Sequence, residues 1–237
     1  MEIGIIFPVY NEEDRLEAGI RRTEEYIKNK LNCNYHIYIV DNASDDRTEE
    51  IGKILEKEYS NLTLCKISQK GVGAAFRKGV AVSAEEIIGY MDVDLSTDIS
   101  YLRNVENIFL SRIGYEIVNA SRFGKKSNAN GRKWYRNITS YGLIILLKIV
   151  FGMKASDAIC GFKFFKRETV LQLMSQSSQE DGWFYMIELL LRAEKGNCRI
   201  YELPVRWDDE TTDSKVQVFE QIKKYIIGII RLKKQWR

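Results

Sequence analysis

The stretch YMDVDLSTD, residues 90–98, ends an apolar run with two carboxylates, Asp92 and Asp94, separated by one valine. The run itself, residues 87–91, is short and continuously apolar, as is typical of a strand buried on both faces. In a parallel α/β sheet, ligands bind outside the carboxyl ends of the strands. The stretch therefore predicts a buried strand that leads directly into a ligand site.

Similar runs recur through the first half of the chain. Strands are predicted at residues 3–9, 35–40, 62–67, 87–91 and 117–120. Amphipathic helices are predicted between them, at residues 12–30, 48–59, 73–83 and 99–111. Asp45 and Asp46 are candidates for the N-cap of the second helix. Strands that alternate with helices predict an α/β fold with a mostly parallel central sheet flanked by helices on both faces.

After residue 121 the character of the chain changes. Residues 121–135 are polar and basic and predict a loop. Further helices are predicted at residues 136–151, 167–176 and 182–195, with a strand at 199–205 and a basic amphipathic helix at 216–237. We therefore expect one domain over residues 1–215, made of a first half (1–121) and a second half (122–215), followed by a C-terminal helical elaboration (216–237).

The composition limits the possible functions. A net charge of +3 over 237 residues gives no sign of a nucleic-acid partner. Cys33, Cys65, Cys160 and Cys198 are widely spaced and read as reduced thiols in a cytosolic setting. His36 is the only histidine, which argues against Ser-His-Asp or Cys-His catalysis and against a histidine-rich metal site.

Acidic groups end three of the predicted strands: Glu12 follows the first, Asp41 ends the second, and Asp92 and Asp94 follow the fourth. Residues two apart in a strand can point the same way, so the last two can share one ligand. Two hard oxygen ligands suit Mg²⁺ or Mn²⁺ when a diphosphate supplies others. The alternative is that these carboxylates are solvated caps or turn formers.

Several motifs, in order and spacing, resemble the nucleotide-binding half of family 2 glycosyltransferases, which share the Rossmann-like GT-A fold. These motifs are PVYNE (8–12), VDNASDDRT (40–48), KGVGAAFRKG (70–79) and DVDLS (92–96). The second half is similar to polyprenyl-phosphate sugar synthases, a group that includes dolichyl-phosphate glucose and mannose synthases. That similarity rests on SRFGKKSNANGRKWYRNITSYG (121–142), SDAICGFKFFKRE (156–168), DGWFYMIELLLRAEKGNCRIYELPVRW (181–207) and a late SK (214–215).

The resemblance implies a donor site for a UDP- or GDP-hexose. Its base pocket would comprise Pro8, Tyr10, Glu12 and Asp41, and Asp41 would accept a hydrogen bond from the base. Asp92 and Asp94 would hold the metal ion and the donor diphosphate. Lys70 and Gly73 would approach the ligand, although a simple helix entry explains this glycine-rich segment equally well.

The resemblance also implies an acceptor site for a polyprenyl phosphate, built from Arg122, Arg136 and Ser140. Arg136 and Ser140 are four residues apart and so share a helical face. Arg132 could contribute, and Lys163 and Lys215 stand at matching motif positions. A basic loop that is merely solvated is the alternative.

The implied activity is that of an inverting, metal-assisted hexosyltransferase. A lipid phosphate is largely ionised near neutral pH, so such an acceptor needs cations to position it and no general base. A saccharide hydroxyl acceptor would instead need a base such as Asp157 or Asp181. A catalytically silent nucleotide-sugar binding module is the third alternative.

Three positions depart from the family pattern. Met186 stands where relatives often have an aspartate, two residues before Glu188. Cys160 replaces a serine, and Lys163 replaces an arginine, which keeps the charge but loses the bidentate fork. These departures predict an acceptor or sugar specificity that differs from that of the best-known relatives, or a weak activity.

A lipid acceptor requires contact with a membrane surface or with a separate membrane protein. Residues 138–152 are shorter than the ~20 residues of a spanning helix and contain Lys148. The N-terminus also lacks a signal-peptide pattern. We therefore expect a cytoplasmic protein that is peripheral on the cytoplasmic face of a membrane.

Two segments could make this contact. They are residues 138–151 and the basic tail, whose apolar residues include Phe219, Ile222, Ile226, Ile229 and Trp236. Ordinary core helices with a solvated basic face are the alternative for both.

Overall fold

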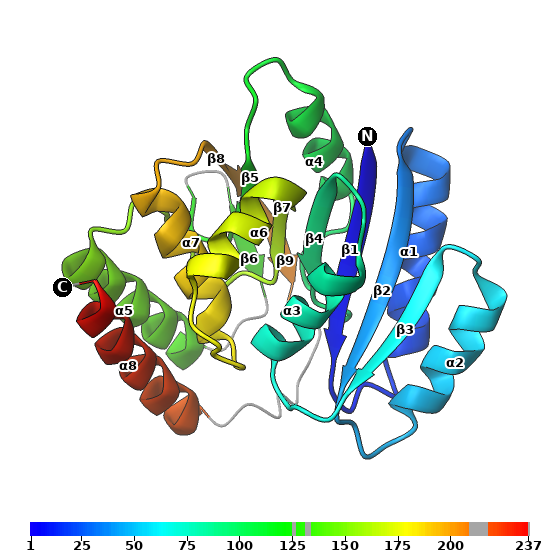
Figure 1. The fold of residues 1–237 in the computed structure, drawn as a ribbon, viewed down its shortest axis with the longest axis horizontal. Coiled ribbons are helices and arrows are strands. Elements are labelled where there is room, and N and C mark those ends of the chain that lie inside the picture. The colour runs from blue at the N-terminus through cyan, green and yellow to red at the C-terminus, as the bar shows by residue number, and fades with distance from the viewer. Residues whose placement is uncertain (125–126, 131–133, 209–217, 237) are drawn as a thin grey trace.

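The computed structural model describes residues 1–124, 127–130, 134–208 and 218–236, and in these it leaves the side chains of residues 128–130, 134–136, 218 and 219 undescribed. Strands and helices alternate along most of the chain (Figure 1). The strands are β1 (Glu2–Val9), β2 (Asn34–Asn42), β3 (Leu62–Ile67), β4 (Ile87–Met91), β5 (Ile117–Ser121), β6 (Asn128–Asn130), β7 (Phe162–Lys166), β8 (Ile200–Pro204) and β9 (Arg206–Asp208). The helices are α1 (Leu16–Lys30), α2 (Thr48–Glu58), α3 (Val72–Val82), α4 (Tyr101–Leu110), α5 (Trp134–Phe151), α6 (Arg167–Gln176), α7 (Phe184–Lys195) and α8 (Val218–Gln235).

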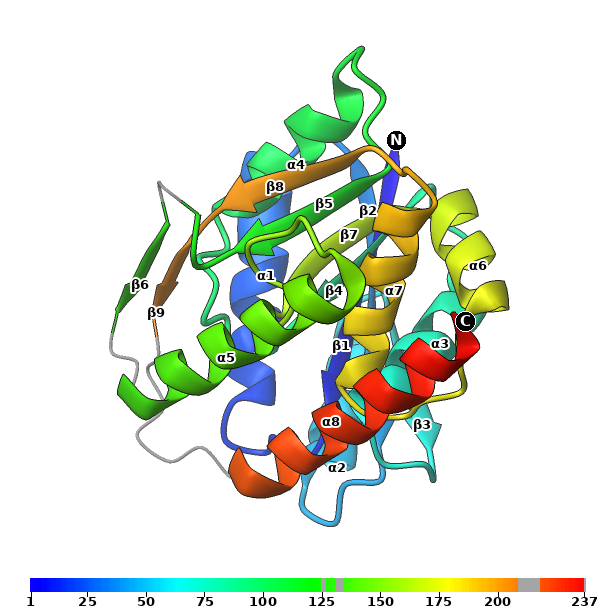
Figure 2. The same ribbon diagram turned by 90° about the vertical axis from the view of Figure 1, so that its left-hand side faces the viewer.

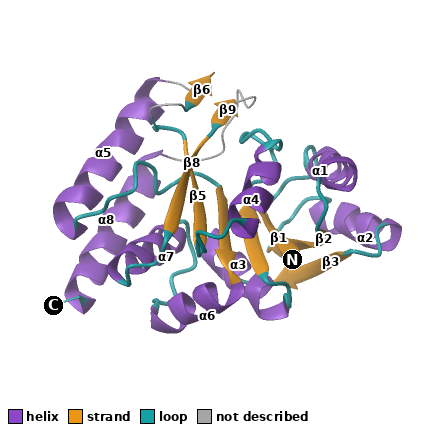
Figure 3. Cartoon of the chain, turned by 90° about the horizontal axis from the view of Figure 1, so that it is seen from above, coloured by secondary structure: helices purple, strands orange, loops and turns teal. Residues whose placement is uncertain are grey.

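Seven strands form the central sheet in the order β3-β2-β1-β4-β7-β5-β8. All neighbours are parallel except β7, which runs antiparallel to β4 and to β5. The carboxyl ends of the other six strands therefore lie at one edge of the sheet, together with the start of β7. Helices cover both faces (Figure 3). The predicted mostly parallel α/β fold is confirmed.

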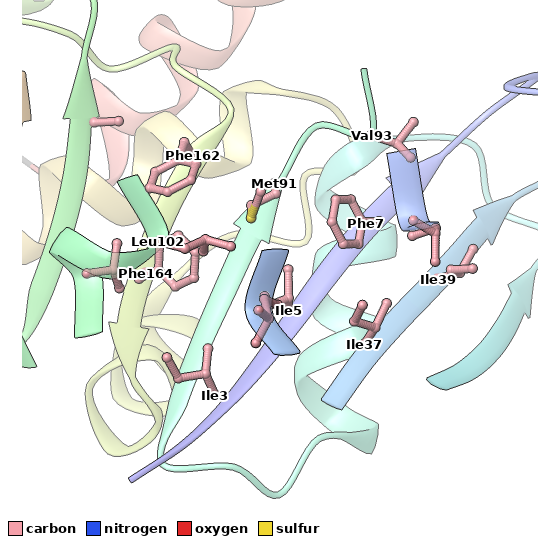
Figure 4. Packing of buried hydrophobic residues seen from close by; sticks show 14 of the residues in the cluster. Ile3, Ile5, Phe7, Ile37, Ile39, Met91, Val93, Leu102, Phe162 and Phe164 are labelled. Atoms are coloured by element: carbon pink, nitrogen blue, oxygen red, sulfur yellow. The ribbon is translucent and has the colours of Figure 1, made fainter. Parts of the chain in front are cut away.

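Alternating side chains of β1 enter two separate cores, as expected for a strand buried on both faces. Ile3, Ile5 and Phe7 pack with residues of α1 and α4 on one face (Figure 4). Ile6 packs on the other face, with residues of α3 and α7 such as Phe76. This two-sided burial fixes the register of β1 and so the position of its carboxyl end.

The helix and strand bounds follow the sequence closely in the first half. β3 and β4 have the predicted bounds, and β1, β2 and β5 extend slightly beyond them. Helix α1 begins at Leu16 instead of residue 12, because residues 10–15 form the connection after β1. In that connection, the Leu16 N–H donates to the carbonyl of Glu12 at 2.8 Å.

Strand β7 is the main element that the sequence does not predict, since no strand is expected between the helices at residues 136–151 and 167–176. Phe162 and Phe164 pack in the α1–α4 core, while Phe165 enters the opposite core. Gly89 of β4 makes room for this strand, because a Cβ atom there would lie 2.2 Å from Cε1 of Phe164. The short strands β6 and β9, which pair with each other in parallel, were also missed.

A third hydrophobic cluster joins α5, α7 and α8 beside the sheet (Figure 2). Each of the three helices contributes an almost fully buried leucine to it, Leu147 from α5, Leu190 from α7 and Leu232 from α8. None of the helices in the described ranges is sufficiently long and apolar to cross a membrane.

Candidate active site at the carboxyl edge

The connections after β1 and β2 are tied together by hydrogen bonds. The backbone N–H of Asn11 donates to Oγ of Ser44 at 3.0 Å, and that of Glu12 donates to Oγ1 of Thr48 at 2.8 Å. Asn11 and Ala43 both adopt a left-handed backbone, with φ of 54° and 68°, which turns each chain sharply away from its strand. The two connections, residues 10–15 and 43–47, are thus held to each other, and together they form the rim of the site.

The predicted N-cap of α2 needs correction. Arg47 occupies the capping position and makes no side-chain capping bond. Asp46 lies one residue earlier, where its Oδ1 accepts a hydrogen bond from the N–H of Thr48 at 2.9 Å. Asp45 instead pairs with Asn11, whose Oδ1 accepts from the Asp45 N–H at 3.0 Å.

Asp41, near the end of β2, is fully buried. Its Oδ1 accepts a hydrogen bond from the N–H of Ser44 at 3.0 Å. Its Oδ2 is buried and has no hydrogen-bond partner within the described part of the chain. A buried acceptor without a donor is unfavourable, so this oxygen is suited to a donor group on a ligand.

Asn42 is a site residue that the sequence analysis did not single out. Its Nδ2 donates to the carbonyl of Val9 at 2.6 Å, and its Oδ1 accepts from the N–H of Gly71 at 2.9 Å. This buried amide therefore joins the ends of β1, β2 and β3. Its position directly after Asp41 was the only signal in the sequence.

Tyr10 and Lys70 lie together at this rim, with Nζ of Lys70 3.4 Å from the centre of the Tyr10 ring. Glu12 forms an ion pair with Arg15, with Nη2 and Oε2 2.6 Å apart. Pro8 lies in β1 beyond the last residue paired with β4, so its lack of an N–H costs no hydrogen bond on that side.

Gly73 packs closely against residues 180–182, the segment before α7. A Cβ atom at Gly73 would lie 2.6 Å from the carbonyl oxygen of Glu180, and its N–H donates to the carbonyl of Asp181 at 2.7 Å. Gly71 has φ of 143°, and a Cβ atom there would lie 2.1 Å from the carbonyl oxygen of Asp181. These contacts favour the alternative of helix entry and packing for this segment.

Asp92 and Asp94 lie in a turn that follows β4, not within the strand. Val93 between them is buried in the core, and Leu95 closes the turn with φ of 52°. Oδ1 of Asp92 accepts a hydrogen bond from the hydroxyl of Tyr90 at 2.9 Å, and Oδ1 of Asp94 accepts from the N–H of Ser96 at 2.9 Å. The turn, not strand alternation, therefore orients the two carboxylates.

Gly161, just before β7, sets the position of the Asp92 carboxylate. A Cβ atom at residue 161 would lie 1.7 Å from Oδ2 of Asp92. The Asp92 N–H also donates to the Gly161 carbonyl at 3.1 Å. The sequence gives little warning of this contact, because it depends on β7 lying beside β4.

The electrostatics of this carboxylate pair favour a cation. Desolvation by the surrounding protein raises the pKa of Asp92 above its ordinary value, and the negative charge of Asp94 raises it further. Asp92 remains exposed to solvent, which limits the first of these effects. In the described ranges, no group of three or more His, Cys, Asp or Glu side chains is placed so that it could hold a metal ion by itself. The pair therefore fits a divalent ion that takes its other ligands from a substrate and water.

Arg122, directly after β5, is buried in an ion pair with Asp157. Its Nε donates to Oδ2 of Asp157 at 2.7 Å and its Nη2 donates to Oδ1 at 3.1 Å. Burial alone raises the pKa of Asp157, but the charge and hydrogen bonds of Arg122 outweigh it and hold that pKa below the ordinary value. Arg122, which the resemblance assigns to the acceptor site, is therefore a fixed and buried side chain. Asp157 is poorly suited to act as a general base.

Lys163 is also buried, on the α7 side of β7, and its Nζ donates to the Cys160 carbonyl at 2.7 Å. Burial lowers the pKa of Lys163, while the nearby acids, including Asp157 and Asp92, oppose this. Cys160 is itself buried, next to Thr97. The Cys160 and Lys163 departures thus affect the interior beneath the site.

The other predicted acceptor residues are only partly visible. Arg136 and Ser140 both belong to α5, and Ser140 is buried. The side chain of Arg136 and the whole of Arg132 and Lys215 lie outside the described residues.

The segment before α7 is anchored by Arg77 and Gln69, two residues for which the sequence predicts no role. Arg77 of α3 forms an ion pair with Asp181, which also accepts a hydrogen bond from Nε2 of Gln69 at 2.7 Å. Glu188 accepts hydrogen bonds from Ser178 and Arg192.

Met186 is buried in the core of α3 and α7. The residue that departs from the family pattern therefore has a packing role.

Three comparisons with known proteins agree with one another. The profile of the family described as Glycosyl transferase family 2 matches residues 4–173. The dolichyl-phosphate beta-glucosyltransferase of Dictyostelium discoideum is 29% identical over 252 residues, covering 98% of this chain and 77% of that protein. A dolichyl-phosphate beta-glucosyltransferase of Trichomonas vaginalis is 31% identical over 232 residues, covering 93% of this chain and 70% of that protein.

Among solved structures, a similar one is the glucosyl-3-phosphoglycerate synthase of Mycobacterium tuberculosis in complex with Mn²⁺, UDP-glucose and phosphoglyceric acid. It superposes with a TM-score of 0.70 at 15% sequence identity, covering 98% of this chain and 80% of that chain. This likeness confirms the expected GT-A fold.

Proposed function

Because this chain belongs to glycosyl transferase family 2, we propose that it transfers a hexose from a nucleotide diphosphate sugar to a polyprenyl phosphate of the dolichyl type, with inversion at the anomeric carbon. The two relatives described above are named for transfer to dolichyl phosphate, and the alignments cover 93–98% of this chain. The observation that carries the proposal is the carboxyl edge itself, where the Asp92 carboxylate lies near both the carboxylate of Asp94 and the buried cation of Arg122.

The donor would bind across the ends of β1, β2 and β4. Oδ2 of Asp41 would accept an N–H of the base, and Tyr10 and Lys70 would lie beside the nucleotide. Asp92 and Asp94 would hold Mg²⁺ or Mn²⁺, which supplies the positive charge that stabilises the departing diphosphate when it is bound. The Mn²⁺ in the complex of the mycobacterial synthase is consistent with this choice of ion.

The acceptor phosphate would bind on the β5 side of Asp92. Arg122 is held in place by Asp157, so it offers a preorganised positive charge there. Arg136 and Ser140 of α5 would complete this part of the site. A phosphate oxygen then attacks the anomeric carbon, and the bond from that carbon to the diphosphate breaks. The attacking oxygen is already ionised, so no general base is required.

This requirement also separates the proposal from transfer to a saccharide hydroxyl. Such an acceptor needs a base, and both acids considered for that role are engaged, Asp157 with Arg122 and Asp181 with Arg77.

A transfer assay tests the proposal. The full chain is incubated with radiolabelled UDP- or GDP-hexoses, Mn²⁺ and a short polyprenyl phosphate in detergent, and the product is extracted into an organic phase. We expect label in that phase that is abolished by mild acid hydrolysis and by omission of the metal. Transfer to soluble saccharides alone would overturn the lipid acceptor. Donor binding by calorimetry without any turnover would instead support a binding module.

A further inference from the structure

Helices α5 and α8 lie on the same side of the molecule, over α7 (Figures 1 and 2). Each helix buries one face in the cluster that they share with α7. Their opposite faces point away from the protein, and both carry large apolar side chains that contact solvent.

On α5, the buried face contains Leu143, Ile144 and Leu147. The opposite face is not polar, as expected for an ordinary surface helix, but presents Ile138, Tyr141, Ile145 and Ile149. Ile149 is 77% exposed, more than any other large hydrophobic residue in the described ranges. This helix is therefore apolar on the face that the protein itself does not cover.

On α8, Tyr225, Ile229 and Leu232 are buried, whereas Ile226, Ile227 and Ile230 are exposed. The exposed isoleucines are flanked by lysines on both sides, Lys223 and Lys224 before them and Lys233 and Lys234 after them. Glu220 is the one acid of this helix in the described ranges. An apolar stripe with basic flanks matches the chemistry of an anionic lipid surface.

Of the tail residues that the sequence predicts to face a membrane, Ile226 is exposed, but two others are not. The side chain of Phe219 lies outside the described residues. Ile229 is in the core, and Trp236 packs on Phe151 with ring centres 5.2 Å apart. Nζ of Lys195, the last residue of α7, lies 4.3 Å from the centre of the Trp236 ring. Trp236 is thus a packing residue. The exposed apolar face of α8 is formed by Ile226, Ile227 and Ile230.

This face connects to the acceptor side of the site. The Tyr141 ring on α5 contacts Phe123, with ring centres 4.5 Å apart, and the Arg122 guanidinium lies 5.3 Å from the centre of the Phe123 ring. A hydrocarbon chain attached to a phosphate near Arg122 could therefore leave the site along aromatic side chains and reach the exposed isoleucines.

We propose that the outer faces of α5 and α8, through the residues named above, form a docking surface for an anionic lipid bilayer. This inference rests on the proposed lipid-phosphate acceptor, and it adds which face meets the bilayer and the lipid charge that it prefers.

Vesicle flotation tests the docking surface. The full chain is mixed with vesicles of phosphatidylcholine alone or of phosphatidylcholine with phosphatidylglycerol. We expect binding to the anionic vesicles, weakened by salt. Ile145→Ser with Ile149→Ser, and Ile227→Ser with Ile230→Ser, should each lower the partition coefficient about tenfold or more. Lys223→Glu with Lys234→Glu should abolish the preference for phosphatidylglycerol.

Ile54→Ser with Ile113→Ser is the matched control. These isoleucines, on α2 and after α4, are 53% and 56% exposed, similar to the 56% of Ile145. The control should bind vesicles like the unmodified chain. Equal losses in the control and test variants would overturn the proposal, as would a dimer in solution that the α5 or α8 variants convert to monomers.

The transfer assay in detergent distinguishes this inference from the proposed function. If the docking variants lose vesicle binding but keep transfer to a short polyprenyl phosphate, both proposals are supported. If the unmodified chain transfers sugar but fails to bind anionic vesicles, the docking surface is wrong and the function stands. If it binds vesicles through these residues but transfers no sugar to lipid, the function is wrong and the surface stands.

Discussion

The carboxylates on the two sides of the carboxyl edge have different partners. On the side of β2 and β4, Oδ2 of Asp41 has no hydrogen-bond partner in the described ranges, and Asp92 and Asp94 lie close enough to repel each other. On the side of β5, Asp157 is as buried as Asp41, but it is paired with the Arg122 guanidinium, which donates two hydrogen bonds to it.

This difference predicts different roles for the two sides of the site. The first side has acceptor oxygens for groups that a ligand and its metal ion bring, so these oxygens are satisfied only when a ligand binds. The second side has its charges already paired within the protein, so it should be rigid beforehand. Substitutions on the first side should therefore affect ligand binding, whereas those on the second should first affect folding.

The largest effect is expected for Asp157→Ala. This change leaves the Arg122 charge buried without its partner and should lower the free energy of unfolding by about 3–5 kcal/mol, measured by urea denaturation. Replacing both partners, with Arg122→Met and Asp157→Leu, should recover much of this loss. A double variant as unstable as the single one would show that the buried charge is not the cause.

The same ion pair predicts a pH dependence. The pKa of Asp157 is lower in the folded chain than its ordinary value of 3.8. Its stabilising contribution is therefore complete above that value and is lost as the pH falls through the lower folded pKa. Between neutral pH and strong acid, the Asp157→Ala variant should lose less stability than the unmodified chain. Parallel losses would contradict the assignment.

Asp94→Ala tests the first side. It should reduce metal-dependent turnover by at least about 100-fold, because it removes a ligand of the ion that stabilises the leaving group. The melting temperature should change little. Asp14→Ala, which removes an exposed carboxylate from the connection after β1, is the control. Calorimetry with nucleotide and Mn²⁺ should lose its heat signal only in the first variant, and unchanged turnover there would refute the role of Asp94.

Gly161→Ala is expected to have a smaller effect. The new methyl group would push the Asp92 carboxylate aside, since that group is the end of a flexible side chain. We expect about tenfold weaker Mn²⁺-dependent nucleotide binding with little loss of stability. Gly142→Ala is the control, because no atom lies within 4 Å of a Cβ atom there. If Gly161→Ala instead destabilised the fold without altering metal dependence, Gly161 would be a packing residue only.

Lys70→Ala should have the smallest effect, a loss of donor affinity of about three- to tenfold, because it removes a cation that Tyr10 helps to hold beside the nucleotide. Lys78→Ala removes the same charge from the exposed side of α3 and should leave affinity unchanged. Tighter binding by Lys70→Ala would mean that this lysine covers a surface that the base needs.

The first half of the fold was predictable because each strand there is a continuous apolar run, and β3 and β4 have the predicted bounds. Strand β7 was missed because Lys163 interrupts its phenylalanines, and a buried lysine in a central strand cannot be foreseen without the acids around it. The run Phe162, Phe164 and Phe165 was the signal that could have identified it.

The site was predictable only at the level of position along the chain. The acids at the strand ends lie where the sequence placed them, at one edge of the sheet. The partners that determine what each side chain can do come from distant segments. Asp157 restrains Arg122, Gly161 limits Asp92, and residues 180–182 fill the space beside Gly73. Such contacts depend on the antiparallel insertion and leave no local pattern.

The place of β7 between β4 and β5 has a consequence for dissecting the molecule. A fragment cut after residue 121 would retain two strands that are neighbours of β7 but not of each other, and each would expose an unpaired, hydrophobic edge. Separately expressed halves should therefore aggregate, while co-expression should allow the second half to supply the missing strand and rebuild a native molecule. A strand of the second half lies between two strands of the first, so neither half can complete the sheet alone.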